Sequence, residues 1–424
     1  MKRFLGSMVP SVVCVLAAAF LVMGAGCERQ DPTPLVLSFE EITSPAGPGS
    51  GEPNFFVSDD GRLYVSWIET ASDGYTLKFS TREGDRWSEP RTIATGDNWF
   101  VNWADFPSVV ADADGALSAH WLVKSGDDTY AYDIHIAHSQ DGGKSWSDAF
   151  KPHTDGTKTE HGFVTMLPWS GDRVLLTWLD GRKFAAAAKS GEGDGDGPGG
   201  PGAELTLRAA LMDREGRLYE ERSLDERVCD CCQTSGVRTP NGAVFAYRDR
   251  SSNEIRDISI ARFYKGEWQE PVTVFEDGWK IAGCPVNGPA VAAQKKRVAV
   301  AWFTIANETA RVKVAFSKDE GKTFDPPVTV DDGDPLGRVD MVMLDDGSVL
   351  VSWMEFGDQG AADIRIRRIQ PDGTSEPSMA VTQTSRERAA GFPQMARTGN
   401  KIYLAWTVPG DPPSIHTAVS SLGR

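Results

Sequence analysis

Three cysteines lie within four positions of each other in the segment "RVCDCCQTSG", residues 227–236: Cys229, Cys231 and Cys232. Clustered thiolates of this kind bind soft metal ions such as Cu(I) or Zn²⁺. In an oxidising compartment the same residues form disulfides. The C-x-C-C spacing matches neither the usual zinc-knuckle pattern nor the redox motif C-x-x-C. The chemistry therefore depends on the compartment and on what the fold brings to these residues.

The amino-terminal segment indicates export. Residues 1–26 contain two basic residues, an apolar run and then small residues directly before Cys27. The segment resembles a bacterial lipoprotein signal, in which that cysteine becomes the lipidated first residue, although Gly24 stands where the signal usually has leucine. The alternative is an uncleaved membrane anchor, since residues 8–26 approach the length of a spanning helix. We expect a signal peptide over 1–26, a lipid on Cys27, a tether over 27–33 and an exported chain in the bacterial cell envelope, membrane-anchored and facing the periplasm or the outside.

The charge of the chain bounds its partners. The formal net charge is −16, and loss of the signal would remove two more basic residues. Such a charge argues against a nucleic acid or an anionic membrane surface as partner, so we expect no nucleic-acid binding and only a lipid contact with the membrane. Four cysteines would remain besides Cys27, and an even number in an exported domain favours disulfides.

A repeat runs through the rest of the chain. A strand-like run that ends in an aromatic residue recurs seven times, at intervals of about 50 to 70 residues, which is the signature of a repeat architecture. A turn such as "DDGR" or "TPNG" usually precedes the run, so each unit begins with a hairpin. The seven aromatic residues are Trp67, Trp121, Trp178, Tyr247, Trp302, Trp353 and Trp406.

A second motif follows in several units. "SQDGGKSW" at 139–146 and "SKDEGKTF" at 317–324 share the pattern S-x-D-x-G-x-x-W/F. In this pattern Ser and Asp side chains cap the amides of a turn, Gly takes a positive φ and the aromatic ring is buried. These segments resemble the Asp-boxes of sialidase-like (BNR-repeat) propellers. The resemblance covers nearly the whole chain after the signal.

Seven units of four strands predict an all-β fold: a single seven-bladed β-propeller domain over residues 34–424. Sialidases have six blades, so six is the alternative count. The last unit has room for only three strands, and we expect residues 34–43, "PLVLSFEEIT", to supply the fourth and close the ring. Residues 184–203, rich in glycine, read as a flexible loop rather than a blade.

The blade geometry predicts which residues share a pocket. The start of each innermost strand and the end of each second strand lie on one face of a propeller, where loops line a cleft. We therefore expect ligand-binding residues in these two sets: Glu160, His161, Asn287 and Arg338, and Asp180, Arg182, Arg248, Asp249, Arg250 and Glu355.

The same geometry brings Cys284 towards the clustered cysteines, because it precedes the next blade. One interpretation is a disulfide between Cys284 and either Cys231 or Cys232. The other is a soft-metal site for Cu or Zn formed by Cys229, Cys231, Cys232 and Cys284.

The resemblance to sialidases implies arginines that hold a substrate carboxylate, a nucleophilic tyrosine paired with a glutamate, and an aspartate as acid/base. Arg248 resembles one of those arginines in position, Glu69 and Asp73 occupy the acid/base loop, and Asp105 in "ADFP" stands where the family has Asn-Pro. However, "GEPN" replaces the Arg-Ile-Pro of the first blade, and no motif supplies the Tyr–Glu pair. Glu69, Asp73 and Asp105 are thus the candidate catalytic residues, and sialidase activity is doubtful.

Three functions follow from the sequence. The chain could be a sialidase-like lipoprotein that binds a glycan or other small ligand at the axial funnel. If it also hydrolyses the glycan, it is a glycosidase related to exo-α-sialidases. It could be a non-catalytic propeller that scaffolds envelope proteins. Both need no cofactor. The third is a metal-binding exported protein that uses the four cysteines for Cu or Zn.

Overall fold

The computed structural model describes Met1, residues 35–185 and residues 204–423. Leu35–Arg424 forms one compact unit. The expected signal peptide, the lipidated Cys27 and the tether lie outside the described residues, as does most of the glycine-rich loop. In the described ranges we find no helix that combines the length and the apolar character needed to cross a membrane.

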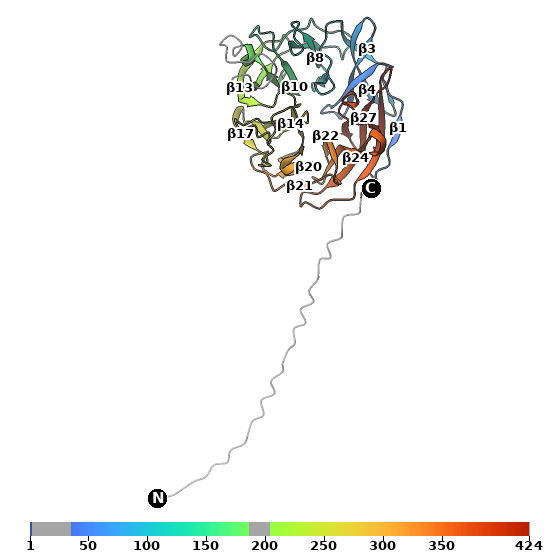
Figure 1. Ribbon diagram of the computed structural model, residues 1–424. Coiled ribbons are helices and arrows are strands. Elements are labelled where there is room, and N and C mark those ends of the chain that lie inside the picture. Colours follow the sequence, from blue (N-terminus) through green and yellow to red (C-terminus); the bar gives the residue numbers. More distant parts are fainter. Residues whose placement is uncertain (2–34, 186–203, 424) are drawn as a thin grey trace. The chain divides into compact units, whose positions relative to one another are not determined.

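Seven antiparallel sheets are arranged in a ring (Figure 1), which confirms the seven-bladed propeller and excludes the six-bladed alternative. The first three blades contain β2 (Ser50–Val57), β3 (Leu63–Ala71), β4 (Gly74–Glu83), β5 (Arg86–Trp87) and β6 (Arg91–Gly96); β7 (Ser108–Ala111), β8 (Leu117–Lys124) and β9 (Tyr132–Ser139); and β10 (His161–Pro168), β11 (Val174–Asp180), β12 (Leu205–Met212) and β13 (Leu218–Val228).

The next three blades contain β14 (Ser235–Thr239), β15 (Gly242–Arg248), β16 (Ile258–Tyr264) and β17 (Glu267–Thr273); β18 (Ala290–Gln294), β19 (Arg297–Thr304), β20 (Arg311–Ser317) and β21 (Val328–Thr329); and β22 (Pro335–Met343), β23 (Val349–Phe356), β24 (Ala361–Ile369) and β25 (Met379–Ser385). The seventh contains β26 (Gln394–Thr398), β27 (Lys401–Val408), β28 (Ser414–Ser421) and β1 (Glu40–Ile42). Short 3₁₀ turns lie at η1 (Ala306–Glu308), η2 (Asp358–Gly360) and η3 (Arg388–Ala390).

The second strand of each blade is largely buried. Strand β11, "VLLTWLD", is buried at every position, because a strand covered by neighbouring blades on both faces needs a continuous apolar run. The repeat aromatics sit in these strands, and Trp67, Trp178, Trp302 and Trp353 are among the largest fully buried side chains of the described residues. The sequence repeat is therefore a repeat of core positions between blades.

Two blades depart from four regular strands. In the first, β6 takes the outer position beside β4, and β5 forms only a two-residue pair at the end of β4. In the second, the sheet contains β7, β8 and β9, and the fourth strand is reduced to a single bridge between Ile136 and Phe150.

Strand β1 closes the ring. It pairs antiparallel with β28, with Glu40 opposite Val419 and Ile42 opposite Thr417, and so becomes the outermost strand of the seventh blade. Each innermost strand contacts the next, and β26 contacts β2. The predicted closure by residues 34–43 is confirmed, and its strand spans the three residues of β1.

The second repeated motif forms the expected turn. Asp141 Oδ1 accepts the amide hydrogens of Lys144 and Ser145, both at 2.9 Å, and Ser139 Oγ accepts that of Gly143 at 2.7 Å. Gly143 has a φ of 84°. The copy around Asp319 makes the same bonds to Thr323 and, through Ser317, to Gly321. The motif therefore stabilises the hairpin turn.

Candidate functional site

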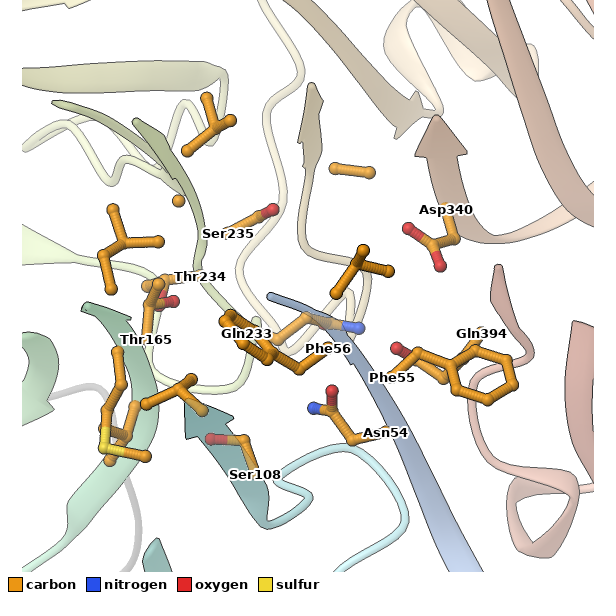
Figure 2. Close-up of a pocket in the computed structure, with 18 of the residues that line it drawn as sticks. Asn54, Phe55, Phe56, Ser108, Thr165, Gln233, Thr234, Ser235, Asp340 and Gln394 are labelled. Carbon is orange, nitrogen blue, oxygen red and sulfur yellow. The ribbon is translucent and has the colours of Figure 1, made fainter. Parts of the chain in front are cut away.

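A cavity of about 430 Å³ lies among the innermost strands. Its wall combines side-chain amides and hydroxyls with aromatic rings, and few of its groups carry charge. Figure 2 shows Asn54, Gln233, Thr234, Thr165, Ser108 and Gln394 around the open space, with Phe55, Phe56 and Asp340 beside them. None of the site residues expected from the sequence is among the described residues of this wall. Sequence reasoning missed the lining because it consists mostly of uncharged residues in the innermost strands and in the positions directly before them.

Three innermost strands are bulged near the start. The registers of β2, β10 and β22 shift there, and the residues in the bulges, Glu52, Phe163 and Arg338, have φ values of 54°, 51° and 51°. A bulge of this kind redirects side chains and is frequent next to functional sites. The preceding blades hold two of these bulges through side chains that the sequence suggested as ligands or catalysts.

Asp105 and Asn287 are those side chains. Both carboxylate oxygens of Asp105 accept the amide hydrogen of Phe163, at 2.9 and 3.0 Å. Asn287 Oδ1 accepts the amide hydrogen of Arg338 at 2.6 Å. Both side chains are buried, so the structure uses them to tie one blade to the next.

Glu52 is the bulge residue whose side chain is unpaired. No hydrogen bond or ion pair joins its carboxylate to another of the described residues, and the side chain is partly exposed. Burial within the surrounding protein raises the pKa of Glu52 to about 7. An unpaired carboxyl that titrates near neutrality, two residues before Asn54 of the cavity wall, is a candidate functional group. In the sequence, the segment "GEPN" stood out only because it lacks the arginine that sialidases have at the start of the first blade, and Glu52 itself was not singled out.

A tyrosine–glutamate pair exists in the structure although no sequence motif predicted one. The Tyr132 hydroxyl donates to Glu160 Oε1 at 2.7 Å. Tyr132 is fully buried and Glu160 is 6 % exposed. Burial raises the pKa of Glu160 well above its usual value, and the nearby carboxylates of Asp230 and Asp105 add to the shift. The pair is a buried link between the second and third blades.

Three of the expected acidic site residues have a common structural partner. Glu69, Asp180 and Glu355 each accept the indole N–H of the repeat tryptophan two residues earlier, at 2.9, 2.9 and 2.8 Å. Glu69 also binds Lys78 at 2.6 Å, and Asp180 binds Arg182 at 2.6 Å. A W-x-acid pattern in "WIE", "WLD" and "WME" was the available signal for this role.

Two of the expected arginines are buried and bound to main-chain oxygens. Arg248 donates to the carbonyls of Asn287, Arg256 and Phe303 at 2.6 to 3.0 Å. Arg338 donates to those of Glu387 and Gly391. Burial and the charge of Arg388 lower the pKa of Arg338 to about 10. Both guanidinium groups therefore hold loops of the ring in place.

The remaining expected residues lie in ion pairs or on the rim. Arg182 bridges Asp180 and Glu221, and buried Arg250 pairs with Glu254 at 2.9 Å. Asp249 accepts the amide of Arg250, and burial, with the charge of Asp225, raises the pKa of Asp249 to about 6. Asp73 lies exposed in the turn between β3 and β4.

His161 belongs to a buried acidic cluster in the third blade. Its Nε2 lies 3.1 Å from Asp155 Oδ2, and its ring stacks on that of His153 with 3.8 Å between centroids. Burial opposes the charge on this imidazole, but the hydrogen bond to Asp155 and the charges of Asp180, Asp155 and Asp133 raise the pKa of His161 above its usual value.

The cysteines gather between blades, as the register predicted. Cys229, Cys231 and Cys232 fall in the connection from β13 to β14, and Cys284 in the connection from β17 to β18. The Sγ of Cys229 lies 3.2 Å from that of Cys232 and 3.8 Å from that of Cys231. Cys231 Sγ also lies within 4.8 Å of Cys284 Sγ.

All four cysteines carry free thiols, so the expected disulfide of Cys284 with Cys231 or Cys232 is not formed in this structure. The separations exceed the 2.05 Å of a disulfide bond. Burial opposes ionisation of Cys229, but hydrogen bonds with Cys231 and Cys232 and the charge of Arg256 lower the pKa of its thiol well below the usual value.

Comparisons with known proteins show the fold. No protein-family model matches the chain, and no curated protein matches its sequence. Among solved structures, the polysaccharide lyase Uly1 is similar with a TM-score of 0.50 and 9 % identity, over 88 % of this chain and 90 % of that one. The endosialidase of phage phi92 is similar with a TM-score of 0.50 and 10 % identity, over 92 % of this chain and 69 % of that one. A mutant of the NanB sialidase from Streptococcus pneumoniae gives 0.46 and 8 % identity, over 85 % and 83 %. The chain thus has a sialidase-like β-propeller fold.

Proposed function

We propose that the protein binds a glycan in the axial cavity. The composition of the cavity wall carries this proposal: amides and hydroxyls, which both donate and accept hydrogen bonds, alternate with the rings of Phe55, Phe56, Phe106 and Phe392. Sugar hydroxyls need donors and acceptors of this uncharged kind, and the apolar faces of a sugar ring pack on aromatic rings. The fold is compatible with such a ligand, since a polysaccharide lyase and an endosialidase share it.

Glu52 is the group that we expect to contact the ligand outside the cavity. Its carboxyl is unpaired and, with a pKa of about 7, keeps a proton through the mildly acidic range. A protonated carboxyl donates a hydrogen bond to a sugar oxygen, and it could also act as a general acid. We therefore expect binding to weaken as the pH rises above 7, because the charged form loses the donor.

We infer that sialoside hydrolysis is not the activity. The sialidase reaction uses a solvent-accessible tyrosine nucleophile and arginines free to bind a carboxylate. Here Tyr132 is fully buried, and the guanidinium groups of Arg248 and Arg338 are occupied by main-chain oxygens. A fluorogenic sialoside should release no detectable sialic acid, and turnover abolished by Arg248→Ala would contradict this inference.

We also propose that the chain is an exported lipoprotein anchored through Cys27. The apolar segment with small residues before Cys27 supports this proposal. Labelling of the expressed protein with a radioactive fatty acid, compared with its Cys27→Ala variant, tests it. Label that persists in the variant would contradict the assignment.

Isothermal titration of the purified protein with neutral and acidic oligosaccharides tests the ligand. Asn54→Leu removes an amide of the cavity wall that has no side-chain hydrogen bond with the described residues, and we expect at least tenfold weaker binding. Asn253→Leu, in an exposed loop between β15 and β16, is the matched control and should bind as the wild type does. Glu52→Gln should remove the pH dependence near 7. Lack of binding by every oligosaccharide, or equal effects of the two asparagine variants, would overturn the proposal.

A further inference from the structure

We propose that Cys229, Cys231 and Cys232 bind a thiophilic metal ion, Cu⁺ or Zn²⁺, and that Cys284 supplies a fourth thiolate from the solvent side. The site is separate from the axial cavity, because none of the four cysteines is among the described residues that line it.

The spacing of the sulfur atoms carries the proposal. The Sγ atoms of Cys229, Cys231 and Cys232 all lie within 4.8 Å of one another, with two separations of 3.2 and 3.8 Å. A tetrahedral ion with metal–sulfur bonds of about 2.3 Å requires its ligands to lie about 3.8 Å apart. The Cys229–Cys231 separation of 3.8 Å already matches that of two ligands around one ion, and the Cys229–Cys232 separation of 3.2 Å is about 0.6 Å shorter, so these two sulfur atoms would move slightly apart on binding. Soft sulfur donors select Cu⁺ or Zn²⁺ over hard cations.

The fold anchors the chain that carries these cysteines on the neighbouring blade. The amide of Cys229 donates to the carbonyl of Arg248 at 2.9 Å, and Val228 bridges to Asp249, so the connection is anchored on the end of β15. Cys229 and Cys232 are 1 % exposed. Ligands held by the surrounding backbone bind an ion without first having to be ordered.

Arg256 compensates the charge that several thiolates would collect. Its Nη1 lies 3.3 Å from Cys229 Sγ and 3.1 Å from Asp230 Oδ1, and its Nη2 reaches Glu254 at 3.1 Å. The side chain is 4 % exposed. Hydrogen bonds to ligand atoms from such a partner orient the ligand and tune the metal.

Cys284 gives the site an open side. It is exposed, and its Sγ lies within 4.8 Å of Cys231 Sγ and of a carboxylate oxygen of Asp230. Its connection from β17 to β18 is separate from the one that carries the other three cysteines. An ion could therefore enter and leave past Cys284 while the buried thiolates retain it, and Cys284 would control the rate of exchange.

Elemental analysis of the full-length protein, purified from membranes without oxygen or chelator, tests the site. We expect about one Cu or Zn per chain, and the analysis itself distinguishes the two metals. Cys231→Ser should reduce the metal content at least tenfold. Cys284→Ser should keep the ion at first but lose it to a chelator several times faster than the wild type. Ser252→Ala, in an exposed loop, is the control and should match the wild type.

A titration with Co²⁺ tests the same site in the wild-type protein and so does not rely on the correct folding of Cys231→Ser. The wild-type protein, freed of metal and reduced, is titrated with Co²⁺, and we expect thiolate-to-cobalt absorption that saturates at about one equivalent. Cys284 is exposed, so Cys284→Ser should fold and show weaker absorption. A bond between the peptides of 229–232 and 284 in non-reduced mass spectra, or free thiols with no metal and no cobalt absorption, would overturn the proposal. Neither readout depends on glycan binding.

Discussion

The Tyr132 hydroxyl donates a hydrogen bond of 2.7 Å to Glu160 Oε1 where both side chains are buried. We expect Tyr132→Phe to lower the free energy of unfolding by about 1–3 kcal/mol, since the variant leaves a buried carboxyl without its donor. Urea unfolding measures the change. Tyr130→Phe is the matched control, because this neighbour is 50 % exposed, and it should shift the free energy by less than about 0.5 kcal/mol. Equal effects of the two variants would contradict a structural role for the pair.

The free energy of unfolding should depend on pH because of the buried carboxyl of Asp105. Burial raises the pKa of Asp105 to about 7, although the Phe163 amide and the Tyr132 hydroxyl lower it in part. The folded state therefore holds a proton that the unfolded state, with a pKa near 3.9, releases. This contribution to stability is complete below about pH 4 and is lost as the pH rises to 7, with a slope of up to about 1.4 kcal/mol per pH unit.

Asp105→Asn should remove that slope. The measurement is the free energy of unfolding from pH 4 to 7.5, in which the wild type should lose stability faster than the variant. Asp97→Asn, at an exposed position, serves as control and should keep the wild-type slope. Parallel curves for the wild type and Asp105→Asn would show that Asp105 does not change its protonation on folding.

Alanine variants of two adjacent glycines can distinguish the effect of backbone strain from the effect of a steric clash. Gly142 and Gly143 both have positive φ, 69° and 84°. A Cβ on Gly143 would lie 2.3 Å from Phe79 Cζ, whereas one on Gly142 would meet nothing within 4 Å. Both alanine variants should lower the free energy of unfolding by about 1 kcal/mol, because a residue with a Cβ is strained at a positive φ. Gly143→Ala should lower the free energy of unfolding by about 1–3 kcal/mol more, because the new Cβ would clash with the aromatic ring of Phe79. Thermal unfolding measures both, and equal melting temperatures would contradict the packing of Phe79 under the turn.

Deletion of residues 34–43 tests the closure of the ring. The deletion removes β1, exposes the edge of β28 and takes away Leu35, Leu37 and Phe39, which pack against the core of the last blades. We expect a markedly lower melting temperature and aggregation through the open edge. A control deletion of residues 28–33 keeps both Cys27 and β1, and its melt should be unchanged. An unaltered melt after the longer deletion would contradict the role of β1.

The sequence predicted the ring well, because the ring is a repeat. One aromatic residue per blade at a buried second-strand position is visible without coordinates, and the shortage of one strand in the last unit indicated where β1 must pair. The turn around Asp141 was equally predictable, since all of its bonds lie within seven residues of the chain. Local patterns and regular periods are therefore readable from one sequence.

The site was harder to predict, because its bonds cross between blades. Asp105 and Phe163 are 58 positions apart, and Asn287 and Arg338 are 51 apart. The polar types at the ends of strands suggested a binding face, yet these side chains satisfy buried amides of the next blade. Nothing in a single sequence distinguishes an acid that binds a ligand from one that holds a bulge. The cysteines were an exception, because the repeat itself placed Cys284 beside Cys231.

The pairing of β1 with β28 also determines how the molecule would respond to a mechanical load. Three residues of β1 are held by one neighbouring strand on the outer edge of the seventh blade. Tension applied to the chain ahead of residue 35 would act first on residues 35–39, which pack against the last blades, and then on this short ladder. Blade seven would then open before the other six, whose strands follow one another without interruption. A membrane tether on that side of the chain would thus pull on a strand that is joined to the ring by three residue pairs.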